Sequence, residues 1–211
     1  MPDKHNSSGL IAAVCCLLLS SACTSLHPPA ETAATKPAIS TLPTTTNGQR
    51  SYQEQIQLNG KINIQYRQAD KPQSMTVSFE WEQDRNSIHV RLLSPLGQTM
   101  AIITQTANLA ILEQAGKEPQ QADNLDQLMQ NTLGWPLPVA GLRDWLQGFV
   151  AIDGKTAKPL KPEDQTLMTQ GWKLRYVSWH ENSSLPKLIN LQRYTEQAGE
   201  VSIRIALDQG Q

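Results

Sequence analysis

The chain has 211 residues, 39% of them hydrophobic, and its 18 basic and 19 acidic residues give a formal net charge of −1. The chain therefore lacks the strong excess of basic residues with which proteins bind nucleic acid or anionic lipid surfaces. The length suits one domain with its own core, preceded by terminal segments of different composition.

Residues 1–22 have the composition of an export signal. An uninterrupted apolar run over 10–19 is too short for a helix that spans a bilayer, which needs about 20 residues. The run and the small residues before Cys23 resemble a bacterial lipoprotein signal, in which the cysteine becomes the first mature residue and is lipidated. Such signals usually carry Leu three residues before the cysteine, whereas this chain has Ser20. The alternative is an ordinary secretory signal cleaved near Ala22.

Cysteine content and composition then separate a tether from a folded domain. After cleavage Cys23 is the single cysteine, because Cys15 and Cys16 lie in the signal, so an intramolecular disulfide is excluded. The stretch that follows Cys23 up to residue 48 is rich in Thr, Pro and Ala and has few large apolar residues. It predicts a disordered tether, which leaves 49–211 as the folded domain.

Alternation of apolar and polar residues predicts an antiparallel sheet. The alternation is unbroken over 56–67 and recurs over 75–82 and 88–92. Turn-like stretches at 68–73 and 84–86 separate these segments, which therefore form a meander. Further strands are predicted at 98–105, 109–114, 117–122, 165–169, 171–179, 187–194 and 201–208.

The segment 88–103 predicts two strands joined by a tight turn. Ser94, Pro95 and Gly97 occupy the positions that a type I turn favours, which leaves Leu96 at the third position, pointing outward. An exposed Leu forgoes about 1.5 to 3 kcal/mol of burial free energy unless something outside the chain covers it. The alternative is that Leu96 folds back onto a neighbouring residue.

Helical spacing replaces alternation after residue 122. Asp123 or Asn124 can cap a first helix that ends at Gly134, and a second short helix is predicted over 139–147. Residues 148–163 are expected to form an irregular connection. The apolar positions of the first helix are Leu125, Leu128, Met129 and Leu133, and those of the second are Leu142, Trp145 and Leu146.

The sequence offers little support for catalysis. His89 and His180 lack partners at metal-ligand spacing, and we expect both to be solvated. Glu80 and Glu82 could form a carboxylate pair, but they more simply face solvent beside basic residues such as Arg91. Nucleophile elbow, phosphate-loop and dinucleotide-turn motifs are missing. We therefore expect no enzymatic activity, no catalytic residue, no metal and no cofactor.

Three motifs resemble the LolB family of outer-membrane lipoproteins: L-L-S-P-L-G at the predicted turn, G-W-P-L-P after the first helix and L-R-D-W-L-Q-G in the second. The resemblance covers 49–211. It implies a mainly β fold, namely a single curved, incompletely closed antiparallel β-barrel with a short helical lid over an apolar cavity. In that family a Leu on a protruding loop is implicated in membrane insertion, and it matches Leu96 here, between Pro95 and Gly97.

The same resemblance implies a function. The protein would take triacylated lipoproteins from the periplasmic carrier LolA and insert them, without nucleotide, into the inner leaflet of the outer membrane. It would be a monomer, lipid-anchored at Cys23 in the outer membrane and facing the periplasm. Thr24 agrees with outer-membrane sorting, because Asp at that position is the usual inner-membrane retention signal in this class of lipoprotein.

The apolar faces of the sheet and helices are expected to meet around the acyl chains. The expected lining is Ile62, Ile64, Val77, Phe79, Trp81, Val90 and Leu92 from the sheet, with Leu128, Met129, Leu142, Trp145 and Leu146 from the lid. Two alternatives remain open. One is a periplasmic binding module for free fatty acid or another amphiphile, without lipoprotein handover. The other is a structural lipoprotein in which these side chains form a filled core.

Overall fold

The computed structural model describes residues 50–209 except for 70, 136, 153–155, 182 and 184. The strands of its main sheet are β1 (Ile56–Gln68), β2 (Lys71–Gln83), β3 (Ile88–Leu93), β4 (Thr99–Thr106), β5 (Leu109–Gln114), β6 (Gln120–Ala122), β9 (Gln165–Thr169), β10 (Trp172–Trp179), β11 (Pro186–Thr195) and β12 (Gly199–Leu207). The helices are α1 (Leu125–Leu133) and α2 (Val139–Trp145), and a separate pair is formed by β7 (Phe149–Val150) and β8 (Lys158–Pro159). Among these described elements, neither helix has the length and hydropathy needed to cross a bilayer.

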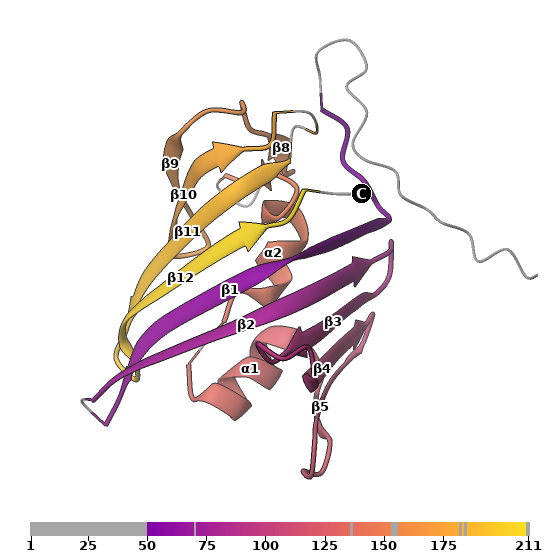
Figure 1. Ribbon diagram of the computed structural model, residues 1–211, viewed down its shortest axis with the longest axis vertical. Coiled ribbons are helices and arrows are strands. Elements are labelled where there is room, and N and C mark those ends of the chain that lie inside the picture. Colours follow the sequence, from indigo (N-terminus) through magenta and orange to yellow (C-terminus); the bar gives the residue numbers. More distant parts are fainter. Residues whose placement is uncertain are drawn as a thin grey trace, which may run out of the picture. The chain divides into compact units, whose positions relative to one another are not determined.

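The main sheet is a curved barrel that stays open, and α1 and α2 lie together on one of its faces (Figure 1). The strand order is β6-β5-β4-β3-β2-β1-β12-β11-β10-β9, and all neighbouring strands are antiparallel. Within the described part of the chain, the edge strands β6 and β9 do not pair with each other. The predicted fold, a mainly β, incompletely closed antiparallel barrel with a helical lid, is confirmed.

Alternation along β1 and β12 gives the barrel its dry face. Antiparallel pairing of the two strands sets Ile62 opposite Ile205 and Ile64 opposite Ile203, with all four side chains buried. The intervening residues, such as Lys61 and Arg204, are exposed. One face of the sheet is therefore apolar and covered, while the other is polar and solvated.

The first hairpin is longer than predicted. The turn expected over 68–73 is wrong, because β1 and β2 stay paired up to Gln68 opposite Lys71. The side chains of Pro72 and Ser74 near this end are exposed. Where both faces of a hairpin contact water, the sequence carries no apolar alternation from which the strands could be recognised.

Smaller differences occur around the helices. The helix α1 begins at Leu125 as predicted, with Asn124 Oδ1 accepting from the Gln127 backbone N–H, and Gly134 ends it in the left-handed conformation (φ 78°). The helix α2 ends at Trp145 rather than at residue 147. Part of the connection predicted to be irregular forms the short β7–β8 pair.

Candidate functional site

An apolar cavity of about 230 Å³ lies between the dry face of the sheet and the two helices. Of the twelve residues expected to line it, the structure brings ten together: Ile62, Ile64, Val77, Phe79, Trp81, Val90, Leu92, Met129, Leu142 and Leu146. These ten residues come from strands β1 to β3 on one side of the cavity and from the helical segment on the other.

Leu128 and Trp145 do not line the cavity, contrary to expectation, although both are fully buried. Leu128 precedes the cavity-lining Met129 and so projects about 100° away around the axis of α1. Trp145 packs its ring on Gly141 of the same helix, and its backbone oxygen accepts from Tyr176 Oη at 3.1 Å. Both side chains therefore belong to the packed core beside the cavity.

Sequence reasoning also missed part of the lining. The additional residues are Met75, Met100, Ala101, Ile103, Leu112, Gln114, Thr132, Leu133, Leu137, Val139 and Ile205. Strand register could have found several of them, because Val90 pairs with Ile103 and Leu92 pairs with Ala101 on the same face. The helical contributors depend on how α1 and α2 are rotated over the sheet, which periodicity alone does not fix.

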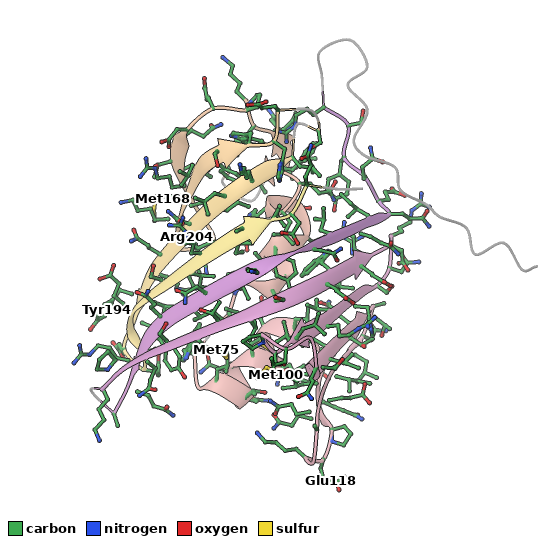
Figure 2. All side chains as sticks on the ribbon, in the orientation of Figure 1. Met75, Met100, Glu118, Met168, Tyr194 and Arg204 are labelled. Atoms are coloured by element: carbon green, nitrogen blue, oxygen red, sulfur yellow. The ribbon has the colours of Figure 1, made fainter. Side chains whose placement is uncertain are left out.

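Three large apolar side chains line the cavity and are also exposed to solvent, and they mark its mouth. Met75 is 39% exposed, Met100 is 45% exposed and Leu133 is 38% exposed. Figure 2 labels two of them, Met75 on β2 and Met100 on β4. Methionine is unbranched and readily changes rotamer, so this rim can adapt to chains that pass through it.

The turn with the L-L-S-P-L-G motif joins β3 to β4, just ahead of Met100. Gly97 N–H donates to Ser94 O at 2.9 Å and Ser94 N–H donates to Gln98 O at 2.8 Å, with Gly97 at φ 79°. This is a type I turn followed by a left-handed glycine, a common hairpin connection. Leu96 at its tip is 86% exposed, and so it does not fold back onto the described part of the chain.

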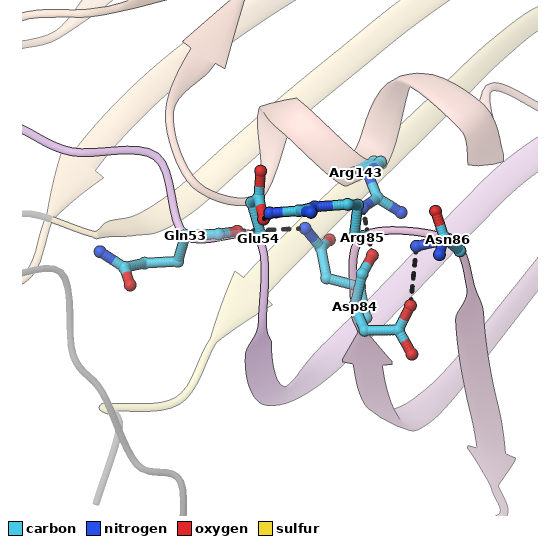
Figure 3. Close-up of polar contacts among 7 residues, drawn as sticks. Gln53, Glu54, Asp84, Arg85, Asn86 and Arg143 are labelled. Atoms are coloured by element: carbon cyan, nitrogen blue, oxygen red, sulfur yellow. Dashed lines mark hydrogen bonds and ion pairs between the residues drawn. The ribbon is translucent and has the colours of Figure 1, made fainter.

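The lid helix α2 is fastened to the turn between β2 and β3 (Figure 3). The Arg143 guanidinium donates to the backbone oxygens of Asp84 and Ser87. That turn is itself ordered by Asp84 Oδ1, which accepts from the backbone N–H groups of Asn86 at 2.7 Å and Ser87 at 2.8 Å. Hydrogen bonds from Ser87 and Asn86 lower the pKa of Asp84. The result is a preformed anchor for one side of the lid.

Other polar groups singled out by the sequence are held in structural contacts. Glu80 forms an ion pair with Arg91 at 3.2 Å, as the simpler alternative predicted. His89 Nδ1 lies 3.1 Å from Thr104 Oγ1, and His180 Nε2 lies 3.1 Å from Leu207 O, so both rings are partly buried rather than fully solvated. The described residues contain no group of three or more His, Cys, Asp or Glu that could hold a metal ion.

Several expectations concern residues outside the described part of the chain. They are the signal over 1–22, the lipidation at Cys23, the tether up to residue 48 and the sorting residue Thr24. These expectations remain predictions.

Comparison with known proteins places these features in context. A family model described as "Outer membrane lipoprotein LolB" matches residues 54–209. The chain is 35% identical over 156 residues to an outer-membrane lipoprotein LolB of Cupriavidus necator, covering 72% of this chain and 78% of that protein. It is 34% identical over 161 residues to the protein of the same name from Ralstonia nicotianae, covering 71% and 77%. Among solved structures, a LolA superfamily protein, NE2245 from Nitrosomonas europaea, matches with a TM-score of 0.39 at 10% identity, covering 72% of this chain and 84% of that chain.

Proposed function

This chain belongs to the LolB family of outer-membrane lipoproteins, and we propose that it is an outer-membrane receptor that binds the acyl chains of other lipoproteins. The observation that carries the proposal is the apolar cavity with its open, methionine-rimmed mouth. Gln114 and Thr132 are the polar residues in a lining of 21 residues, and a lining of this kind suits hydrocarbon.

The energetic cost of this cavity supports a ligand over a purely structural role. Side chains that line an unfilled apolar cavity lose packing contacts, so such a cavity lowers the stability of a domain. The cavity of about 230 Å³ leaves apolar side chains of both the sheet and the lid without packing partners on one side. A structural lipoprotein would gain stability by filling this space, so its retention favours a binding function.

We propose that the cavity widens when cargo enters. Its volume of about 230 Å³ is below the roughly 300 to 1,000 Å³ of most ligand pockets. A triacylated anchor needs more room than this. Met75, Met100 and Leu133 at the mouth are the residues whose movement would enlarge the cavity.

We propose further that cargo arrives from the periplasmic carrier LolA and leaves for the inner leaflet of the outer membrane without nucleotide. Each acyl CH₂ removed from water contributes about 0.8 kcal/mol, so the anchor needs an apolar environment at every stage. Without an energy source, direction must come from increasing affinity along carrier, receptor and bilayer.

Two sites are proposed to bring the receptor to the bilayer. A lipid on Cys23 would hold the protein at the outer membrane, facing the periplasm. Leu96 on the β3–β4 turn, flanked by Pro95 and Gly97, would enter the bilayer beside the mouth and promote release. Support for this role is the exposure of Leu96 and the proximity of its loop to Met100 in sequence.

The test uses the chain with Cys23→Ala behind a cleavable signal, mixed with carrier that holds a labelled lipoprotein. We expect the label to move to the receptor without added nucleotide. Label that stays on the carrier would overturn the handover proposal. If the receptor nevertheless binds free fatty acid in that case, it is a fatty-acid-binding module.

A further inference from the structure

Arg50, which lies just before β1, binds the turn that follows the lid helix α2. Its Nη2 donates to Gln147 O at 2.8 Å and to Gly148 O at 2.7 Å. Its Nη1 donates to Leu160 O at 3.0 Å. A planar guanidinium can hold three carbonyl oxygens in this way, and charge-assisted hydrogen bonds are stronger than neutral ones.

The position of the Arg50 guanidinium is fixed by aromatic rings and by a glycine. Its central carbon lies 4.7 Å from the centre of the Trp179 ring and 5.3 Å from that of Phe149. A Cβ atom at Gly148 would lie 2.7 Å from Arg50 Nη2 and 2.6 Å from the Trp179 ring. The close approach of Arg50 therefore requires glycine at this position.

A second pair of hydrogen bonds joins the same segment to the same turn. Gln53 backbone N–H donates to Gln147 Oε1 at 2.9 Å, and Gln147 Nε2 donates to Gln53 O at 3.0 Å. The side chain of Gln147 is almost fully buried in this arrangement. A reciprocal, buried amide pair of this kind fixes both partners, because breaking it leaves unsatisfied polar groups.

The turn that Arg50 and Gln53 hold, at residues 147–148, follows directly after the lid helix α2. The helix α2 supplies Val139 and Leu142 to the cavity, and Leu146 directly after it supplies a third side chain. Arg143, in the last turn of the helix, donates to the β2–β3 turn, while Arg50 and Gln53 bind the residues that follow the same end of the helix.

We propose that the Arg50 side chain and the Gln53 backbone, the latter through the Gln147 side chain, hold α2 over the cavity and thereby slow the escape of a bound acyl chain. The inference rests on the proposed acyl-binding function and extends it to residues outside the family match, which begins at residue 54. Arg50 also follows the expected tether almost directly. These contacts, which we call the clamp, therefore lie between the segment proposed to carry the lipid anchor and the lid.

The test measures two properties of the Cys23→Ala chain behind a cleavable signal. One is the dissociation rate of a fluorescent fatty acid, and the other is hydrogen exchange of the α2 amides. We expect Arg50→Ala and Gln147→Ala each to raise the dissociation rate about tenfold or more, since a weakened contact acts mainly on dissociation. Exchange should rise over 142–150 and stay unchanged in α1. Arg50→Lys should be intermediate, because an ammonium cannot reproduce the planar fork.

Arg91→Ala is the matched control, because Arg91 forms an ion pair with Glu80 on the polar face of β2 and β3 and is not among the residues described as holding α2. It should leave both properties unchanged. Folded Arg50→Ala protein with unchanged dissociation and unchanged α2 exchange would overturn the clamp. If the unsubstituted protein binds no fatty acid, the acyl-binding proposal fails, while the exchange measurement still decides whether Arg50 holds α2.

Discussion

Gly60 on β1 lies directly opposite Phe79 on β2, and the space that a side chain would take at position 60 is filled by the Phe79 ring. A Cβ atom at Gly60 would lie 3.0 Å from this ring and would clash with the backbone oxygen of Ala206 on β12. Phe79 lines the cavity, so the glycine is part of how the sheet accommodates the site.

Gly60→Ala should therefore destabilise the domain by about 1 to 3 kcal/mol, the usual cost of overpacking. Urea unfolding followed by tryptophan fluorescence measures this change. Asn59→Ala, at the exposed neighbouring position, should stay within about 0.5 kcal/mol of the unsubstituted chain. Equal stability of the two variants would contradict the packing described here.

Ala101 and Ala110 allow the effect of filling the cavity to be distinguished from the effect of overpacking the core. Both are buried on the dry face, but Ala101 lines the cavity and Ala110 does not. Ala101→Leu should fill the space and lower fatty-acid affinity at least severalfold, with little loss of stability because unfilled volume receives the new atoms. Ala110→Leu should instead cost about 1 to 3 kcal/mol in a packed region. Fluorescent fatty-acid titration and urea unfolding of both variants distinguish these outcomes, and identical effects would count against a cavity at this place.

Sequence pattern predicted the strands of the main sheet because burial on one face imposes a period of two, but it missed the two-residue strands β7 and β8. It placed Ile62, Val77 and Val90 at the cavity for the same reason. It failed at the far end of the first hairpin, where Pro72 and Ser74 contact water and no period exists. Local chemistry predicted the turn, since Ser94 to Gly97 specify its geometry without reference to the rest of the fold.

The helical side of the site was harder to predict. Trp145 is as apolar as Leu142, yet it faces the core because Gly141 leaves room for its ring. The contacts of Arg50 with Gln147 span 97 residues, and no spacing rule connects positions so far apart. Such features follow from how α2 docks on the sheet, which depends on tertiary packing.

Asp144 on α2 makes the free energy of unfolding of the domain depend on pH. Burial raises the pKa of Asp144 from its ordinary 3.8, and the opposing effects of the Tyr52 hydroxyl and Arg143 are smaller. The folded protein therefore holds this proton more tightly than the unfolded chain does. Protonated Asp144 therefore contributes stability in full below pH 3.8, its ordinary pKa. This contribution is lost as the pH rises through the pKa that Asp144 has in the folded protein.

Asp144→Asn keeps an acceptor for the Tyr52 hydroxyl and cannot ionise. Its free energy of unfolding, relative to the unsubstituted chain, should therefore increase between pH 3.5 and pH 7. Asp164→Asn should change in the opposite direction, because the Arg175 guanidinium lowers the pKa of Asp164. Urea unfolding at several pH values measures both, and parallel pH profiles for the two variants would contradict this assignment.

Leu96→Glu tests the proposed role of the turn in release. Because Leu96 is 86% exposed, the substitution should leave the free energy of unfolding and fatty-acid affinity nearly unchanged. It should slow transfer of labelled lipoprotein from the receptor to vesicles by roughly 10- to 150-fold, the equivalent of losing about 1.5 to 3 kcal/mol of Leu burial in lipid.

Met168→Glu, at a 62% exposed apolar residue on edge strand β9 (Figure 2), is the matched control and should transfer normally. If both variants slow transfer equally, added surface charge explains the effect and the turn has no special role. If only Leu96→Glu is slow, the contact between Leu96 and the bilayer limits release, since the cavity and its cargo affinity are the same in both proteins.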